Sequence, residues 1–169
     1  STGQNNTFIG YATAFSNATI SDLTAVGSHA MYNNVGQQNN AFGYKALYAN
    51  TSGEANLGIG CHTLMDSTTG SYNIAVGHNG LYENTTGTRN TCVGVNSLQE
   101  NTTQTDNTAV GYLTLRNNEE SQCTAIGSYA LALATSAGQN VAVGHAAGYN
   151  TTTGNHNVAI GFTSGYYST

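Results

Sequence analysis

The sequence predicts an all-β protein, a parallel β-solenoid of about ten coils of about 17 residues each. Three observations support this fold class. A glycine returns at almost constant spacing, a large apolar residue precedes it in every copy, and a turn-forming stretch closes most copies. A copy of this length is too short for a pair of packed helices, but it can hold short strands and turns.

The glycine that anchors each copy recurs every 16 or 17 residues. Its fixed place indicates a corner where φ is positive or where a side chain would collide with a neighbour. Each copy has only two or three core residues, so copies must stack to bury them, and residues 1–169 are expected to form one domain. The anchors are Gly10, Gly27, Gly43, Gly60, Gly77, Gly94, Gly111, Gly127, Gly144 and Gly161.

The residues before each anchor are predicted to form a strand. Val, Ile or Phe stands directly before the glycine in all ten copies, and Ala stands two before it in seven. Such alternation of large and small residues is typical of a strand. Asn occupies the fourth place before the glycine in eight copies, where stacked amides can hydrogen-bond along the solenoid.

The residues after each anchor are predicted to form a second strand and a closing turn. Leu or Met stands four after the glycine in seven copies, and this residue is assigned to the second strand. Asn-Thr-Thr-Gly, as in residues 84–87, then closes the copy. It predicts a turn because Asn and Gly tolerate positive φ and Thr hydroxyls satisfy local backbone groups.

Composition excludes several classes of function. Charged residues are only 7% of the chain, and Lys45, Arg89 and Arg116 form no basic cluster, so no nucleic acid partner is expected. No apolar run is long enough to cross a bilayer, so no membrane insertion is expected. The chain does not open on a signal peptide, which fits a mature form or an excised fragment. An odd number of cysteines, three, argues against a disulfide framework and favours small buried thiols.

The repeats resemble a known group of proteins. Residues 73–77 (NIAVG), 140–144 (NVAVG) and 157–161 (NVAIG) are similar to the head repeats of YadA-type trimeric autotransporter adhesins. Residues 107–115 (NTAVGYLTL) resemble the repeats of phage and large-virus fibre proteins. The similarity extends over all ten copies, although the copies here are longer than those of the adhesin heads.

This resemblance implies a left-handed β-roll in which three chains pack side by side as a homotrimer. It further implies that the Val and Ile side chains fill the core of each chain, while the small residue between them faces the neighbouring chains. A single thin roll would also have little core of its own, which favours the same assembly. The trimer contacts implied in this way are Ala75, Ala109, Ala125, Ala142 and Ala159.

No catalytic residues, metal site or cofactor are expected. The chain contains no GxSxG, HExxH or phosphate-binding loop. Asp66, Glu83 and Glu100 share one column on successive coils, which is expected to face solvent because like charges at strand spacing repel. His29 and His62 share a column but are two coils apart, about 10 Å by strand spacing, which is too far for one metal ion. The chain is therefore predicted not to be an enzyme.

A column of aromatic residues five after the glycine is the candidate binding surface. Rings on a flat β face can stack against sugars, and the candidates are Tyr32, Tyr48, Tyr82 and Tyr149. The alternative is that these rings cover the edge of the core or the seam of a trimer.

The sequence therefore predicts an extracellular structural and cell-attachment module of a trimeric surface fibre. Such a fibre would belong to a virion, as a viral or phage fibre, or to a bacterial cell surface, as an adhesin. Rigidity and multivalency would let it contact host-surface glycans or another receptor. Two alternatives stay open: an ice-binding β-solenoid with regular Thr arrays, and a purely structural spacer.

Overall fold

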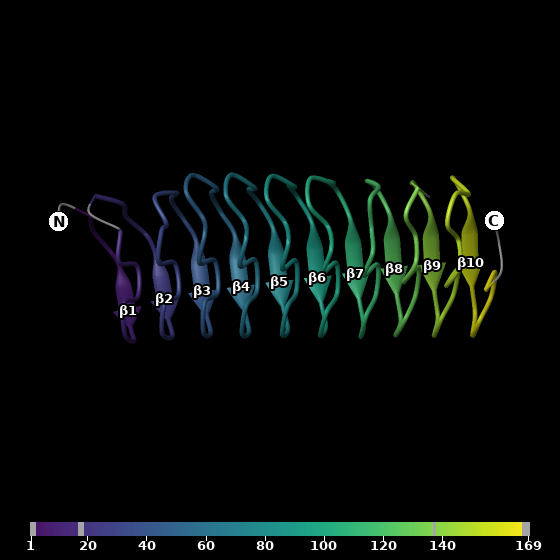
Figure 1. Cartoon of the computed structure of the whole chain (residues 1–169), viewed down its shortest axis with the longest axis horizontal. Coiled ribbons are helices and arrows are strands. Elements are labelled where there is room, and N and C mark those ends of the chain that lie inside the picture. The colour runs from purple at the N-terminus through teal and green to yellow at the C-terminus, as the bar shows by residue number, and fades with distance from the viewer. Residues whose placement is uncertain (1–2, 17–18, 137, 167–169) are drawn as a thin grey trace.

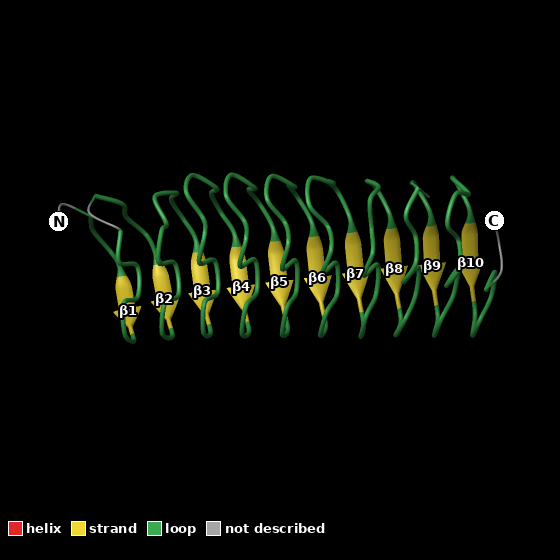
Figure 2. Cartoon of the chain, viewed as in Figure 1, coloured by secondary structure: helices red, strands yellow, loops and turns green. Residues whose placement is uncertain are grey.

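The chain forms a rod of stacked coils in a computed structural model that describes residues 3–16, 19–136 and 138–166 (Figure 1). The described residues contain ten three-residue strands and no helix, and the strands line up along one side of the rod (Figure 2). The strands are β1 (Thr7–Ile9), β2 (Thr24–Val26), β3 (Asn40–Phe42), β4 (Leu57–Ile59), β5 (Ile74–Val76), β6 (Thr91–Val93), β7 (Thr108–Val110), β8 (Thr124–Ile126), β9 (Val141–Val143) and β10 (Val158–Ile160).

All ten strands are parallel and pair in chain order, β1 to β10, in one sheet. Equivalent residues of adjacent coils are paired side by side in register, as Val93 is with Val110. The backbone ladder continues past the strand ends, because the N–H of Gly94 donates to the carbonyl of Val76 at 2.7 Å. The predicted fold class, an all-β parallel solenoid with tandem repeats, is confirmed, and the ten strands span about nine turns.

The Leu segment is not a second strand, contrary to the prediction. The residues after each anchoring glycine form successive turns, in which two positions per coil have positive φ, such as Asn96 at 54° and Leu98 at 50°. Because φ changes sign at these positions, the N–H groups of Asn96 and Leu98 point to opposite neighbouring coils. The N–H of Leu98 donates to Thr114 of the next coil at 3.0 Å, and that of Asn96 donates to His78 of the previous coil at 2.9 Å.

The positive φ angles also lie elsewhere than predicted within the coil. They fall in the Leu segment and at the residue before each Asn of the fourth place, such as Arg89 at 57°. Asn84 and Gly87, in the closing turn, are not among the positive-φ residues. The anchoring glycines do have positive φ, for example 143° at Gly94, and this prediction is confirmed.

The core of each coil consists of the Leu column and the small column. Leu64, Leu81, Leu98 and Leu115 are fully buried, as are most of the small residues two before the glycine. The large residues directly before the glycine point outward, and Val93 is 40% exposed. The expectation that Val and Ile fill the core is therefore wrong.

The alanines assigned to a trimer contact lie inside the chain instead. Ala75, Ala109, Ala125 and Ala142 are 0% exposed within a single chain, so they cannot line a contact between chains, while Ala159 in the last coil is half-buried. The coil is narrow, so only a small side chain fits between the strand and the turns that face it. At Gly58, an added Cβ would already lie 2.9 Å from the hydroxyl of Thr63.

Buried asparagines form two ladders inside the rod. In the first, Asn73 Oδ1 accepts the N–H of Asn90 at 3.0 Å, and Asn73 Nδ2 donates to the carbonyl of Gly87 at 2.8 Å. In the second, Asn101 Nδ2 donates to Asn84 Oδ1 at 3.0 Å. The predicted stacking of Asn is thus confirmed, although the first ladder bonds to backbone. Each buried group left without its partner would cost about 1–3 kcal/mol.

The cysteines are free thiols, and two of the three are buried as predicted. Burial raises the pKa of the Cys92 thiol to about 12, which keeps it protonated. Cys61 is only half-buried, because it follows its glycine onto the surface of the coil. In the part of the chain that the structure describes, no helix is long and apolar enough to span a membrane.

Candidate binding surfaces

Aromatic rings gather into two groups on the turn side of the coils. The N-terminal ring cluster is connected by ring contacts from the first coil to the coil of β5, and its members are Tyr11, Phe15, His29, Tyr32, Tyr44, Tyr48, His62, His78 and Tyr82. The C-terminal ring cluster consists of Tyr112, Tyr129, His145, Tyr149, Phe162 and Tyr166. Between them, the coil of β6 carries Val95, Asn96 and Gln99 at the equivalent positions.

The four predicted binding tyrosines are divided between these clusters. Tyr32 and Tyr48 stack with ring centroids 5.3 Å apart and planes 17° apart. Tyr82 packs edge-on against His62 in the same cluster, with ring centroids 6.2 Å apart. Tyr149 belongs to the C-terminal cluster, where it stacks on Tyr166 at 5.1 Å. All four rings are half-buried, so each keeps an exposed edge or face.

The two clusters differ in charge and shape. Lys45 lies 5.4 Å from the ring centroids of both Tyr44 and Tyr48, and this cation–π contact gives the N-terminal cluster a positive charge. In the C-terminal cluster, the rings border a shallow hollow of about 360 Å³. Its lining residues are Tyr129, His145, Ala146, Tyr149, Thr163 and Tyr166. An apolar hollow edged by hydroxyl and imidazole groups suits a small ligand with one apolar and one polar face.

The strand face is the second candidate surface. We use this name for the outward side chains at the first and third positions of β2 to β10. No charged residue occurs in these strands. Several of its large side chains are between 36% and 42% exposed: Phe42, Ile59, Ile74, Val93, Ile126 and Val141. The third position is Val, Ile or Phe in every one of these strands, whereas the first position is Thr or Asn in five of the nine. Extended exposed apolar columns are typical of interaction surfaces.

Sequence reasoning missed the strand face because it placed the large residues inside. The signal was present in the unbroken column of Val, Ile and Phe, which never contains a charge. Strict alternation shows that a strand has two different faces, but not which of them points inward. Because the coil is narrow, the small Ala side chains point inward and the larger side chains point outward.

The acidic column lies beside a polar hollow of about 440 Å³ that Glu83, Glu100 and Glu119 help to line. Glu100 Oε1 is paired with Arg116 Nη2 at 3.1 Å, and Glu83 is exposed. Partial burial raises the pKa of the Asp66 carboxyl. The arrangement agrees with the expectation of a largely solvated column.

The histidines are arranged differently from the expectation. Sequence reasoning compared His29 with His62, which share a column, and did not compare His62 with His78. These two residues belong to neighbouring columns of adjacent coils, and their ring centroids are 5.9 Å apart. The repeat register contained this information, because Cys61 and His78 each directly follow an anchoring glycine.

Comparison of the chain with protein-family models, with curated proteins and with solved structures finds no match. A function for the chain is therefore inferred from its ring clusters, its strand face and the repeat pattern of its sequence.

Proposed function

We propose that the chain is a non-enzymatic structural and attachment module of an extracellular trimeric fibre, on a virion or on a bacterial cell. The observation that carries this proposal is the strand face, which has no charge and carries an unbroken column of exposed or half-buried Val, Ile and Phe directly before the anchoring glycines. A rod with such a face is stabilised when copies of the chain cover it, since apolar area removed from water contributes about 25 cal/mol per Å². The similarity of the repeats to those of trimeric adhesin heads and viral fibres supports the same assembly.

The proposed trimer contact is the strand face rather than the alanine column. A parallel sheet in register repeats the apolar third-position column in each coil, so two copies can align along their whole length. The face also carries no charge that would be buried on association. Burying an unpaired charge would cost several kcal/mol, so its absence favours a buried role for this face.

Mass measurement by light scattering tests the assembly. The wild-type chain is expected to have about three times its own mass of 17.5 kDa at micromolar concentration. Val93→Asp, which places a charge in the middle of the strand face, is expected to yield folded monomers. Thr86→Asp, on an exposed closing turn, is the matched control and should leave the trimer intact. A monomeric wild-type protein would contradict the proposal.

Attachment is assigned to the ring clusters, and first to the C-terminal one because it borders a hollow. Three equal copies of a weak sugar site in a trimer would raise the overall affinity by multivalency. The first threonine of the closing turn argues against ice binding, because in several coils its hydroxyl bonds to the backbone of the next coil. Thr85 Oγ1, for example, donates to the carbonyl of Thr102 at 3.0 Å.

Glycan-array and cell-binding measurements test the attachment. Tyr149→Ala combined with Tyr166→Ala is expected to weaken binding about tenfold, since a stacked ring contributes about 0.5–1.5 kcal/mol beyond its buried area. Tyr32→Ala combined with Tyr48→Ala removes the equivalent stacked pair from the N-terminal cluster and is expected to have a smaller effect. Tyr72→Ala, which removes an exposed ring outside both clusters, is the control. Wild-type protein that binds no glycan or cell would favour the structural spacer.

A further inference from the structure

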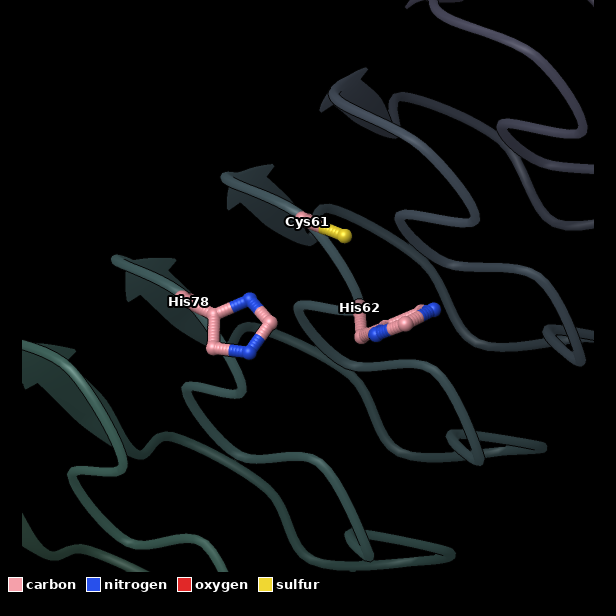
Figure 3. A group of neighbouring side chains, drawn as sticks. All are labelled: Cys61, His62 and His78. Carbon is pink, nitrogen blue, oxygen red and sulfur yellow. The ribbon is translucent and has the colours of Figure 1, made fainter.

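Three metal-ligating side chains converge on two adjacent coils within the N-terminal ring cluster. Cys61 and His62 directly follow the anchoring Gly60, and His78 directly follows Gly77, so Cys61 and His78 occupy equivalent positions. In-register stacking brings such positions to about 4.8 Å from each other. Figure 3 shows the thiol and the two imidazole rings next to one another on these coils.

The donor atoms of the three side chains are close enough to share one ion. One Cys sulfur and one nitrogen from each His all lie within 4.8 Å of one another. Among the described residues, this is the one group of three or more Cys, His, Asp or Glu side chains with that property. In a tetrahedral zinc site, bonds of about 2.0–2.3 Å place the ligand atoms roughly 3.5 Å apart. Rotation of the side chains that moves the donor atoms by about 1 Å is enough to reach this spacing. All three residues are partly exposed, which leaves room for that movement.

An amide oxygen that can accept a hydrogen bond from the His62 ring lies next to the group. Asn79 occupies in the next coil the position of His62, and its buried Oδ1 forms no well-aligned hydrogen bond within the described residues, although its side chain lies within reach of the His62 ring. Metal-bound imidazoles usually donate their second N–H to such an oxygen. Asn79 can therefore orient the ring of His62 when that ring holds an ion.

We propose that Cys61 Sγ and one ring nitrogen each of His62 and His78 bind a single zinc-type divalent ion, with solvent at the fourth position. Mixed thiolate and imidazole ligands select zinc and its relatives over magnesium or calcium, which prefer oxygen. The ion would join the coils of β4 and β5 through their side chains, and so it would stabilise the rod at this level. This site lies in the N-terminal ring cluster, apart from the proposed trimer contact and from the C-terminal ring cluster to which the glycan contact is first assigned.

Titration of the metal-free, reduced protein with Co²⁺ tests the site. The expected result is one ion per chain, with the near-ultraviolet absorption band of a cobalt–thiolate bond. Zinc is expected to displace the cobalt and to raise the melting temperature. Cys61→Ser should abolish the thiolate band, while His62→Asn and His78→Ser should each weaken binding by more than the ~10–100-fold that loss of a supporting residue typically costs.

The variants and controls are matched by the repeat itself. The residue introduced by each substitution already occurs at the equivalent position of another coil. Ser28 and Ser128 correspond to Cys61 and His78, and Asn79 corresponds to His62, so the coil geometry is retained. His145→Ser removes an exposed imidazole from the column of His78, and Cys92→Ala removes a buried thiol; neither is expected to alter binding. Cobalt bound without the thiolate band, or equal affinity in wild type and the three site variants, would overturn the proposal.

Discussion

Replacing Leu98 with aspartate is expected to break the rod in its middle. Leu98 is fully buried in the coil of β6, and loss of its side chain alone costs about 2–5 kcal/mol. A carboxylate in the same place has no charge partner in the apolar core, which adds several kcal/mol. The backbone does not offset this, although φ at Leu98 is 50° and Asp tolerates that conformation better than Leu. Urea unfolding followed by far-ultraviolet circular dichroism measures the effect.

Val93→Asp is the matched control for this prediction. It places the same charge in the same coil, but on a side chain that is 40% exposed. The coil itself is therefore expected to stay folded, and the change should appear in the mass of the assembly instead. If Val93→Asp unfolded an already monomeric protein while Leu98→Asp did not, the assignment of inner and outer faces would be reversed.

Gly94→Ala is expected to have the second largest effect, because two separate costs act at this position. The φ of 143° is strained for any residue with a Cβ, at about 1–3 kcal/mol. An added Cβ would also lie 2.1 Å from the carbonyl oxygen of Gly111 in the next coil. Since that neighbour is backbone, the two coils must separate, and the ladder bond from the N–H of Gly111 to Val93, now 2.8 Å, would weaken. We expect faster amide hydrogen exchange in both coils.

Gly161→Ala separates the two costs. Its φ of 124° is strained in the same way, but the nearest atom to an added Cβ is Ser164 Cβ at 3.9 Å, in ordinary contact. The loss of protection at its own coil is therefore expected to be smaller than at Gly94. Equal losses at the two sites would show that φ alone requires glycine and that close stacking of the coils does not.

The strand face and the metal group depend on the same geometric property. In-register parallel stacking converts each column of the sequence into a row along the rod. A row of Val and Ile becomes an apolar surface, while a row in which Cys61 is followed by His78 becomes a pair of neighbouring ligands. One exchanged residue in one coil can therefore create a site without any change of fold.

The sequence by itself determined the stack, its register and part of its core. Anchoring glycines at intervals of 16 or 17 residues leave one way to superpose the copies, so the parallel order of β1 to β10 follows. The Leu column could be assigned to the core because it holds Leu or Met in seven copies. The corner at Gly94 could be assigned because its position is glycine in every copy. These features are local and repeated, so ten copies reinforce each one.

Only the tertiary structure decided which strand face points inward and how the Leu segment runs. Alternation with a period of two defines two faces, but the inner one is chosen by the space left opposite the strand, which admits Ala109 and not Val110. Leu98 has a positive φ that its own preferences disfavour, because the closed coil and its bonds to both neighbouring coils require the inversion. The division of the tyrosines into two ring clusters likewise depends on contacts between coils, which no single copy contains.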